Sequence, residues 1–310
     1  MSKLVSVIIP CYNEEENISN LYNELIEKLN KSVSYEFLFV DDGSKDKTTN
    51  EVQTLGEEDK RVKLIDFSRN FGKEAAMLAG LDYAAGDAAV IIDADLQMPV
   101  ATINDLIKLW QEGNKLVLTY KTRRKKGLKS KLATKYYDVF NNISDTQIQN
   151  DALDFQIMDR EVINTICSMR ERTRFFKGIT GYIGYDFKII PVDISERTAG
   201  ESSFSSSKTL FSYAFKSIAL YSDLPLKFSI IIGGITAFIS FLYLIFIVFN
   251  TLINGIGVPG YASTLAIMMF LFSIVLIILG VMGYYISLIY NEVKQRPNYI
   301  VNETKNIEEE

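Results

Sequence analysis

The stretch Ala88–Asp95, AAVIIDAD, decides the fold, because five apolar residues run directly into two carboxylates separated by one alanine. An uncharged run of this length is typical of a strand buried on both faces of a sheet. Carboxylates at the end of such a strand lie where α/β sheets gather their ligand groups. Paired carboxylate oxygens there suit Mg²⁺ or Mn²⁺, which neutralises a diphosphate. Asp93 and Asp95 are therefore candidate metal ligands, with chance occurrence or helix capping as the alternative for an isolated DxD tripeptide.

Similar apolar runs occur on both sides of this stretch, at a spacing that leaves room for a helix between consecutive runs. The expected strands are Leu4–Ile9, Glu36–Val40, Val62–Ile65, Ala88–Ile92 and Leu116–Tyr120, and the expected helices are Glu14–Leu29, Thr48–Leu55, Lys73–Ala84 and Ile103–Gln111. This alternation indicates βαβ units and predicts an α/β fold, Rossmann-like, with a mainly parallel sheet. The loops that follow the strands are then the place where a site is expected.

The second expected strand is followed by Asp41–Gly43, in which two like charges are adjacent. Such a pair needs a cation or hydrogen-bond donors, unless the turn is simply solvated. After the first strand, Asn13 is a candidate cap for the helix that follows, and Asp46 is the equivalent candidate for the second helix.

The composition excludes several kinds of chemistry. The 310 residues include no histidine, which excludes Ser-His-Asp and Cys-His catalysis, HExxH zinc sites and a histidine general base. Two cysteines, Cys11 and Cys167, cannot form a disulfide scaffold, as expected in a reducing compartment. The net charge of −5 argues against nucleic acid as a partner. Acid–base chemistry must therefore use carboxylates, Lys, Tyr or Cys.

The carboxyl-terminal part is strongly apolar. None of the 33 basic and 38 acidic residues lies between Lys227 and Glu292. Residues 228–249 and 263–286 are each long enough, at about 1.5 Å per residue, to cross a hydrocarbon core of ~30 Å, and the Gly- and Pro-containing connection predicts a hairpin. Lysines flank this hairpin and its loop is uncharged, so the positive-inside rule puts both termini in the cytoplasm. Two buried helices of a large soluble core are the alternative.

Two other segments are marked by charge. Eight of the fifteen residues that begin at Lys121 are basic and none is acidic. The helical apolar spacing that follows predicts an amphipathic helix in the membrane interface at about residues 129–143, with a solvated basic loop and an ordinary packing helix as the alternative.

The predicted organisation is a cytoplasmic catalytic domain at 1–215, the two spans of a multi-pass cell-membrane protein, and a cytoplasmic acidic tail at 292–310 that is disordered from Asn302.

Several motifs resemble those of the family 2 inverting glycosyltransferases of GT-A fold, and within them the polyprenyl-phosphate glycosyltransferases, which include bactoprenol glucosyltransferases and dolichyl-phosphate mannose synthases. The matching motifs are VIIPCYNEEENI from Val7, VDDGSKDKT from Val40, SRNFGKEAAMLAGL from Ser68, DADLQMP from Asp93, DFQIMDR from Asp154 and ERTAGESSFSSSK from Glu196. With the two carboxyl-terminal spans, the likeness covers nearly the whole chain.

The resemblance implies a GT-A catalytic domain followed by a transmembrane hairpin. It implies an enzyme that moves one sugar, with glucose or N-acetylglucosamine favoured, from a nucleotide-sugar donor, with a UDP-sugar favoured, to undecaprenyl phosphate at the cytoplasmic membrane face. The implied partners are the donor, the lipid acceptor and the bilayer, in cell-envelope synthesis, and a homo-oligomer is compatible with them. A processive polysaccharide synthase is one alternative, but the single tryptophan, Trp110, leaves no QxxRW signature. A catalytically inert membrane-tethered binding protein is the other, and broken carboxylate motifs would favour it.

The resemblance also implies roles for individual residues. The donor-binding residues would be Pro10, Tyr12, Glu14, Asp41, Asp42, Lys73, Gln97 and Arg197. Asp93 and Asp95 would hold the metal and the sugar diphosphate, and Asp154 would orient the acceptor or a sugar hydroxyl rather than act as a general base; these three are the implied catalytic residues. A solvent-facing helix residue is the alternative for Lys73, and a helix or turn cap is the alternative for Asp154.

The acceptor phosphate is expected to meet basic residues that follow the fifth strand. Arg123 and Arg124 match the family's phosphate-binding residues there, and arginine suits this role because its planar fork binds phosphate oxygens in pairs. Attraction to anionic lipid head groups is an alternative that can coexist. The chain departs from the family pattern at Gln156, where an arginine is frequent, so the resemblance suggests that Arg197 or Lys208 supplies that cation.

A phosphate acceptor also agrees with the absence of histidine. A phosphate monoester is largely dianionic near neutral pH, because its second pKa is about 6, and it can attack the sugar without a strong protein base. The protein is then left to orient the reactants, to stabilise the departing nucleoside diphosphate and to screen two anions from each other.

Overall fold

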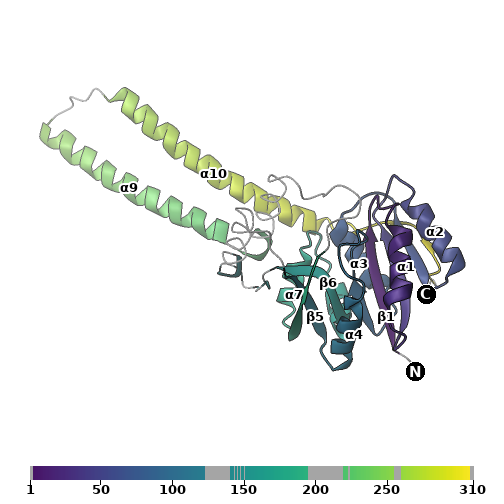
Figure 1. The fold of residues 1–310 in the computed structure, drawn as a ribbon. Coiled ribbons are helices and arrows are strands. Elements are labelled where there is room, and N and C mark those ends of the chain that lie inside the picture. The colour runs from purple at the N-terminus through teal and green to yellow at the C-terminus, as the bar shows by residue number, and fades with distance from the viewer. Residues whose placement is uncertain are drawn as a thin grey trace. The chain divides into compact units, whose positions relative to one another are not determined.

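The structure of the chain is a computed structural model that describes residues 3–122, 140–142, 144, 146, 148–149, 151–194, 219–222, 224–254 and 260–307. The chain divides into two compact units, one made of Met1–Ala214 and Arg296–Glu310 and the other of Phe215–Gln295. The first unit carries the sheet with its covering helices, and the second carries two long helices (Figure 1).

The first unit is built on a sheet in which the described strands follow the order β7-β5-β6-β4-β1-β2-β3-β8. Their bounds are β1 Leu4–Cys11, β2 Ser34–Asp41, β3 Val62–Phe67, β4 Ala88–Ile91, β5 Leu116–Lys121, β6 Ala152–Asp159, β7 Phe187–Val192 and β8 Val301–Lys305. Parallel pairs join β1 to β2 and β4, β2 to β3, and β5 to β7. β6 runs antiparallel between β4 and β5, and β8 runs antiparallel along β3. The prediction of a mainly parallel α/β sheet is confirmed.

Helices cover both faces of this sheet. They are α1 Ile18–Lys28, α2 Thr48–Glu58, α3 Lys73–Tyr83, α4 Thr102–Gln111, α6 Arg160–Ser168 and α7 Phe176–Tyr182. Successive side chains of a strand point to opposite faces, so each strand can fill two cores. In β1, Val7 and Ile9 pack in a cluster with α1 and α4, whereas Ile8 packs with α3, α6 and α7. These two apolar layers hold the strand ends, and with them the loops of the site, in place.

The first part of this unit agrees well with the predictions made from the sequence. Each of the five expected strands and four expected helices is present, although α1 begins at Ile18 rather than near Glu14. The carboxyl-terminal tail is different. The prediction of disorder from Asn302 is wrong for the described part of the tail, because Val301–Lys305 forms β8 and pairs with β3.

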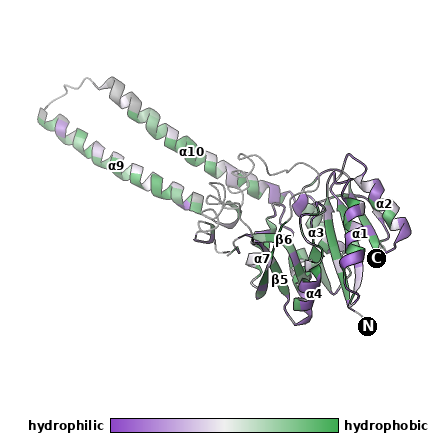
Figure 2. Cartoon of the chain, in the orientation of Figure 1, coloured by the Kyte–Doolittle hydropathy of each residue, from purple (hydrophilic) through white to green (hydrophobic). Residues whose placement is uncertain are grey.

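The second unit contains α9 (Leu224–Asn254) and α10 (Tyr261–Val293). Both helices are long and apolar enough to cross a membrane, over Leu226–Ile247 and Ile267–Val293. Among the residues of these windows whose burial is described, none is buried within the protein, and Figure 2 shows apolar residues predominating along both helices. Such surfaces call for an apolar environment rather than water. A buried core helix, the alternative considered from the sequence, does not fit this exposure.

Most of the predicted interfacial helix at residues 129–143 lies outside the described residues. Within it, residues 140–142 are helical, and Phe140 is fully buried. Its ring meets that of Phe175 edge to face, with centroids 6.1 Å apart. Phe140 therefore packs in the protein interior, and contact of the rest of the segment with a membrane stays a prediction.

Candidate active site

The sheet topology brings carboxylates from three strands to one edge. Asp41 ends β2, and Asp93 and Asp95 follow β4, which runs parallel to it through β1. β6 runs in the opposite direction and pairs its Gln156 with the last residue of β4. Asp154, near the start of β6, therefore reaches the same edge as the end of β4. The topology explains how residues more than a hundred positions apart form one acidic site.

Lys73, the first residue of α3, lies between two of these carboxylates. Its Nζ is 2.7 Å from Asp93 Oδ1 and 2.8 Å from Asp154 Oδ2. The three side chains are 38%, 30% and 24% exposed, so the cluster is open to solvent on one side. The alternative of a solvent-facing helix residue does not describe Lys73, because its ammonium pairs with two carboxylates. The cap alternative for Asp154 also finds no support, because this side chain binds the ammonium.

The pKa values of the two carboxyls shift in opposite directions, although the Lys73 ammonium lowers both. Burial by itself raises the pKa of Asp154, but the attraction of Lys73 and of Lys177 outweighs it and lowers the pKa to about 2. Burial raises the pKa of Asp93, and repulsion from Asp154 and Asp95 adds to it, against the attraction of Lys73. The pKa of Lys73 is raised despite its burial, because both carboxylates favour its charged form. The negative potential of these carboxylates thus favours a cation at the cluster.

The carboxylate oxygens at this edge of the sheet suit a divalent cation as ligands. Within the described residues no group of three or more acidic or cysteine side chains is arranged as a metal cage. Mg²⁺ and Mn²⁺, however, are commonly held by one or two carboxylates together with phosphate oxygens of a substrate. Asp93 and Asp95 interact electrostatically and follow the same strand end, which suits this mode. Lys73 already shows that Asp93 accepts a cation as its partner.

Asp42 holds the loop that leads into α3. Its Oδ1 accepts the backbone N–H of Phe71 at 2.6 Å, and Oδ2 accepts that of Gly72 at 2.9 Å. The residue is only 3% exposed, and burial raises its pKa to about 6 against the effect of these two donors, with repulsion from Asp41 also raising it. The solvated-turn alternative for Asp41–Gly43 is therefore wrong.

Asp41 is satisfied within its own turn. It is fully buried, and it accepts the backbone N–H of Ser44 at 3.0 Å and the hydroxyls of Ser44 and Thr49. These donors are what the sequence analysis required for adjacent like charges. The pair is thus built into the fold, with Asp41 closing the turn and Asp42 fixing the neighbouring loop.

The two predicted helix caps have different outcomes. Asn13 does not cap α1, because its φ is 55° and its Oδ1 accepts the backbone N–H of Lys45 at 2.8 Å, which ties the first two strand-end loops together. Asp46 does accept the N–H of Thr48, the first residue of α2, at 3.0 Å. Both side chains therefore shape the loops around the site.

The other predicted donor residues lie at the same strand ends. Pro10 is buried in β1, and the Tyr12 side chain just beyond it is 40% exposed. Glu14 accepts the Asn17 side-chain amide at 2.6 Å, which closes the turn before α1. The backbone N–H of Gln97 donates to Asp95 Oδ1 at 3.2 Å. Contact of these four residues with a donor stays a prediction. The same holds for the donor contact of Arg197 and for the acceptor-phosphate contact of Arg123 and Arg124, and these three arginines lie outside the described residues.

Sequence reasoning missed two charged residues next to the cluster. Lys177 of α7 is the second cation that lowers the pKa of Asp154. Glu74 accepts the backbone N–H of Phe176 at 2.9 Å, and burial together with repulsion from Asp154 raises its pKa to about 7. Lys177 is thus a cation beside Asp154 other than Arg197 and Lys208, the two candidates named from the sequence, which lie outside the described residues. No motif marked it, because its role depends on how α7 packs on β6.

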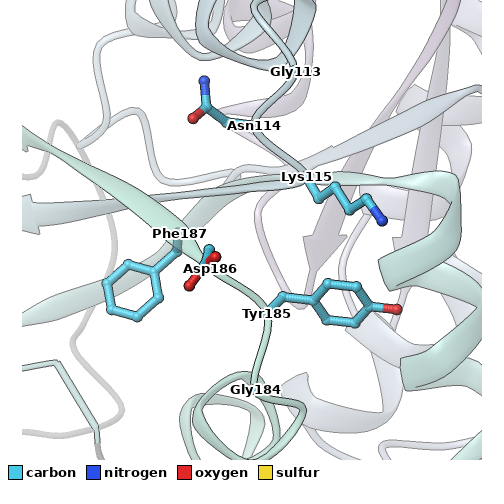
Figure 3. A pocket seen from close by; sticks show the side chains of 7 residues that line it. All are labelled: Gly113, Asn114, Lys115, Gly184, Tyr185, Asp186 and Phe187. Atoms are coloured by element: carbon cyan, nitrogen blue, oxygen red, sulfur yellow. The ribbon is translucent and has the colours of Figure 1, made fainter.

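The first unit also contains a cavity that lies away from this cluster. A cavity of about 440 Å³ is lined by residues that precede β5 and β7, among them Asn114, Lys115 and Tyr185 (Figure 3). Lys115 pairs there with Glu161 at 2.6 Å, and its ammonium lies 5.6 Å from the centre of the Tyr185 ring. Because β5 and β7 begin at this edge, the cavity is at the opposite end of these strands from the carboxylate cluster.

A mainly parallel sheet with a DxD pair at the carboxyl end of a central strand is the arrangement of GT-A glycosyltransferases. The model of the glycosyl transferase family 2 matches residues 6–170, so the chain belongs to this family and is a glycosyltransferase. The matched segment contains the Asp41–Gly43 turn, the DxD pair, Lys73 and Asp154. The resemblance inferred from the motifs is confirmed.

Relatives match over almost the full chain. An uncharacterized glycosyltransferase of Synechocystis sp. is 39% identical over 98% of this chain and 96% of its own length. The prophage bactoprenol glucosyl transferase homolog of Escherichia coli K12 is 39% identical over 97% of this chain and 99% of its own. Among solved structures, Staphylococcus aureus TarS in complex with UDP-GlcNAc is similar with a TM-score of 0.50 and 18% identity, over 70% of this chain and 66% of that one. That structural likeness shows the fold alone.

Proposed function

We propose that this glycosyltransferase transfers one sugar, with inversion, from a nucleotide-sugar donor to undecaprenyl phosphate at the cytoplasmic face of the cell membrane. The observation that carries the proposal is the Asp93–Lys73–Asp154 cluster beside Asp95, in a chain with two helices of membrane-spanning length. The bactoprenol glucosyl transferases of Shigella phages, 40% identical over 97% of this chain, support the polyprenyl-phosphate acceptor and favour glucose over N-acetylglucosamine.

The donor would enter at the ends of β1, β2 and β4. Tyr12, with its exposed ring, is available to stack on the base, and Asp42 has carboxylate lone pairs for a ribose hydroxyl or a base N–H beyond the amides it already accepts. The sugar diphosphate would then extend toward Asp93 and Asp95. We favour a UDP-sugar as the donor.

Positive charge at the cluster would serve the departure of the nucleoside diphosphate. Asp93 and Asp95 would hold Mg²⁺ or Mn²⁺ together with the diphosphate, and the ion would supply neutralisation of the charge that develops on the leaving group. Lys73 offsets the repulsion between Asp93 and Asp154, and on this proposal the anionic donor would approach its ammonium. Its ammonium can turn toward the diphosphate while the carboxylates bind the metal.

On the acceptor side, Asp154 would orient the acceptor or a sugar hydroxyl rather than remove a proton from it. Its lowered pKa makes it a poor proton acceptor, and a dianionic phosphate needs no base. Lys177 would screen the incoming phosphate from the acidic edge, a task that Arg123, Arg124 and Arg197 would share. Attack of the phosphate oxygen on the anomeric carbon, from the side opposite the leaving diphosphate, would invert the configuration.

The test is transfer by membranes that contain the full chain. They are incubated with undecaprenyl phosphate and, in separate reactions, radiolabelled UDP-glucose, UDP-N-acetylglucosamine or GDP-mannose, and the lipid is extracted. We expect a labelled lipid with one sugar from UDP-glucose, lost in Asp95→Asn and kept in Lys115→Met, which removes an ion-paired lysine from the opposite edge. No labelled lipid from any donor would overturn the proposal, and label in a polymer would favour a processive synthase. An α-linked product from the α-linked donor would overturn inversion.

A further inference from the structure

The residues that follow α10 form a strap, Arg296–Ile307, that packs on the first unit beside the loop Ser68–Gly72, here the donor loop. We propose that this strap positions the donor loop, and through it Asp42 and Lys73, with Tyr299 as the main positioning residue. The proposal rests on the proposed function in that it assigns the loop to donor binding. The contacts themselves do not depend on that assignment.

The outer part of the strap is attached along the sheet edge. β8 pairs antiparallel with β3, and Asn302 Nδ2 donates to the carboxylate of Asp66 at 2.8 Å. The Asn306 side-chain amide donates to the carbonyls of Gly56 and Val62, at 2.7 and 2.9 Å. These side-chain bonds add to the ladder, so the strap has a defined register rather than a loose association.

The inner part of the strap contacts the start of the donor loop. The backbone N–H of Ser68 donates to the carbonyl of Ile300 at 3.0 Å. The Tyr299 ring stacks on that of Phe67, with centroids 5.2 Å apart and planes within 11°, and its hydroxyl donates to Asp82 at 2.7 Å. Phe67 in turn meets Phe71 edge to face, with centroids 5.7 Å apart. Tyr299 is thus linked to Phe71 of the donor loop by two successive ring contacts, through Phe67.

The opposite side of the donor loop is held by the strand-end carboxylates. Asp42 accepts the backbone N–H groups of Phe71 and Gly72. Gly43, with φ of +67°, lies so close to the loop that a Cβ there would be 2.5 Å from the carbonyl carbon of Arg69. The loop is therefore held between the Asp42–Gly43 turn and the strap.

The consequence for the site follows from chain continuity. Gly72 immediately precedes Lys73, whose ammonium bridges Asp93 and Asp154. Loss of the strap contacts would give the loop freedom at Phe67 and Phe71, and both the Asp42 carboxylate and the start of α3 would lose their fixed partner. Misplacement of positioning groups by about 1 Å is enough to lower turnover substantially. The donor, rather than the lipid acceptor, should be affected.

The test compares Tyr299→Ala with Tyr299→Phe in the full chain, and uses Tyr22→Ala as the matched control. Tyr22 also bonds a carboxylate, Asp59 at 2.8 Å, and its ring meets Phe37 edge to face, but it packs on the other face of the sheet. We expect Tyr299→Ala to raise the KM for the donor roughly tenfold with little change in the KM for undecaprenyl phosphate. Tyr299→Phe keeps the stacked ring and should retain most of the affinity. Tyr22→Ala should lower the melting temperature without changing either KM.

A readout independent of turnover separates this inference from the proposed function. Hydrogen exchange of peptides that cover residues 68–73 should be faster in Tyr299→Ala than in the wild type and in Tyr22→Ala. Unchanged exchange together with an unchanged dissociation constant for UDP in the presence of Mn²⁺ would overturn the positioning role. If the wild type neither transfers sugar nor binds UDP, the proposed function fails while the exchange experiment still decides the role of the strap. If Tyr299→Ala does not fold, Tyr299→Leu provides the same comparison.

Discussion

Replacing Lys73 by Met removes one ammonium and leaves an unbranched side chain of similar length. The ammonium lies 2.7 Å from Asp93 and 2.8 Å from Asp154, so each contact has a gross Coulomb energy of about 6 kcal/mol at an effective dielectric constant of about 20. Most of this is offset by desolvation, and breaking a fully buried pair costs about 3–5 kcal/mol. Because Lys73 is 38% exposed, solvent screening reduces this to roughly 2 kcal/mol.

A loss of roughly 2 kcal/mol corresponds to a melting temperature about 4–8 °C lower for a unit of this size. The variant should regain more stability from Mn²⁺ than the wild type does, because its carboxylates have lost their internal cation. Transfer should fall by roughly a hundredfold even with Mn²⁺ present, because the leaving diphosphate loses a fixed positive charge.

The assay is thermal unfolding of purified protein in detergent, with and without MnCl₂, together with transfer to undecaprenyl phosphate. Lys115→Met is the control, because Lys115 forms a single 2.6 Å ion pair with Glu161 and is 47% exposed at the opposite edge of the sheet. If Lys73→Met unfolds at the same temperature as Lys115→Met and transfers sugar as fast, the ion-pair cluster has no part in the site.

Four further predictions address the metal, pH, acceptor and topology. Asp95→Asn or EDTA should remove most transfer without lowering the melting temperature by more than a few degrees, and full activity in EDTA would contradict the metal. Donor binding measured without acceptor should weaken as pH falls through about 6, because Asp42 gains a proton and loses an acceptor site, and Asp42→Asn should flatten this dependence. Arg123→Ala with Arg124→Ala should raise the KM for undecaprenyl phosphate far more than that for the donor, whereas a loss confined to the donor would move these arginines to the diphosphate. A reporter after the last residue should be cytoplasmic and one between α9 and α10 external; the same side for both would contradict the hairpin.

The first five strands could be predicted because each is an apolar run between polar turns, a local signal that does not depend on pairing partners. β8 lacks this signal. Its sequence, Val301–Lys305, has one apolar residue in five, and it is a strand because β3 offers an open edge and Asp66 offers an acceptor to Asn302. Edge strands of this kind are decided by tertiary contacts rather than propensity.

The site likewise contains residues with a local sequence signal and residues whose contacts depend on tertiary structure. Asp93 and Asp95 could be predicted as strand-end carboxylates, because position along the chain was enough to place them. The pairing of Lys73 with Asp154 could not be predicted in this way, since Asp154 reaches this edge because β6 lies antiparallel beside β4. The antiparallel strand, which breaks the βαβ pattern, is what brings the third carboxylate to the edge.

The donor loop connects Asp42 to the cluster of Lys73, Asp93 and Asp154. Its last two backbone N–H groups bind Asp42, and the next residue in the chain, Lys73, binds Asp93 and Asp154, so the loop cannot shift without moving a partner at each end. A donor that contacted both Asp42 and the diphosphate end would therefore bind to one connected unit. On this reasoning a change at Tyr299 acts on nucleotide and diphosphate contacts together, whereas a change at Asp95 acts on the diphosphate alone. UDP and free pyrophosphate as competing inhibitors would test this, since Tyr299→Ala should weaken inhibition by both ligands, and by UDP more than by pyrophosphate, whereas Asp95→Asn should remove most of the pyrophosphate inhibition.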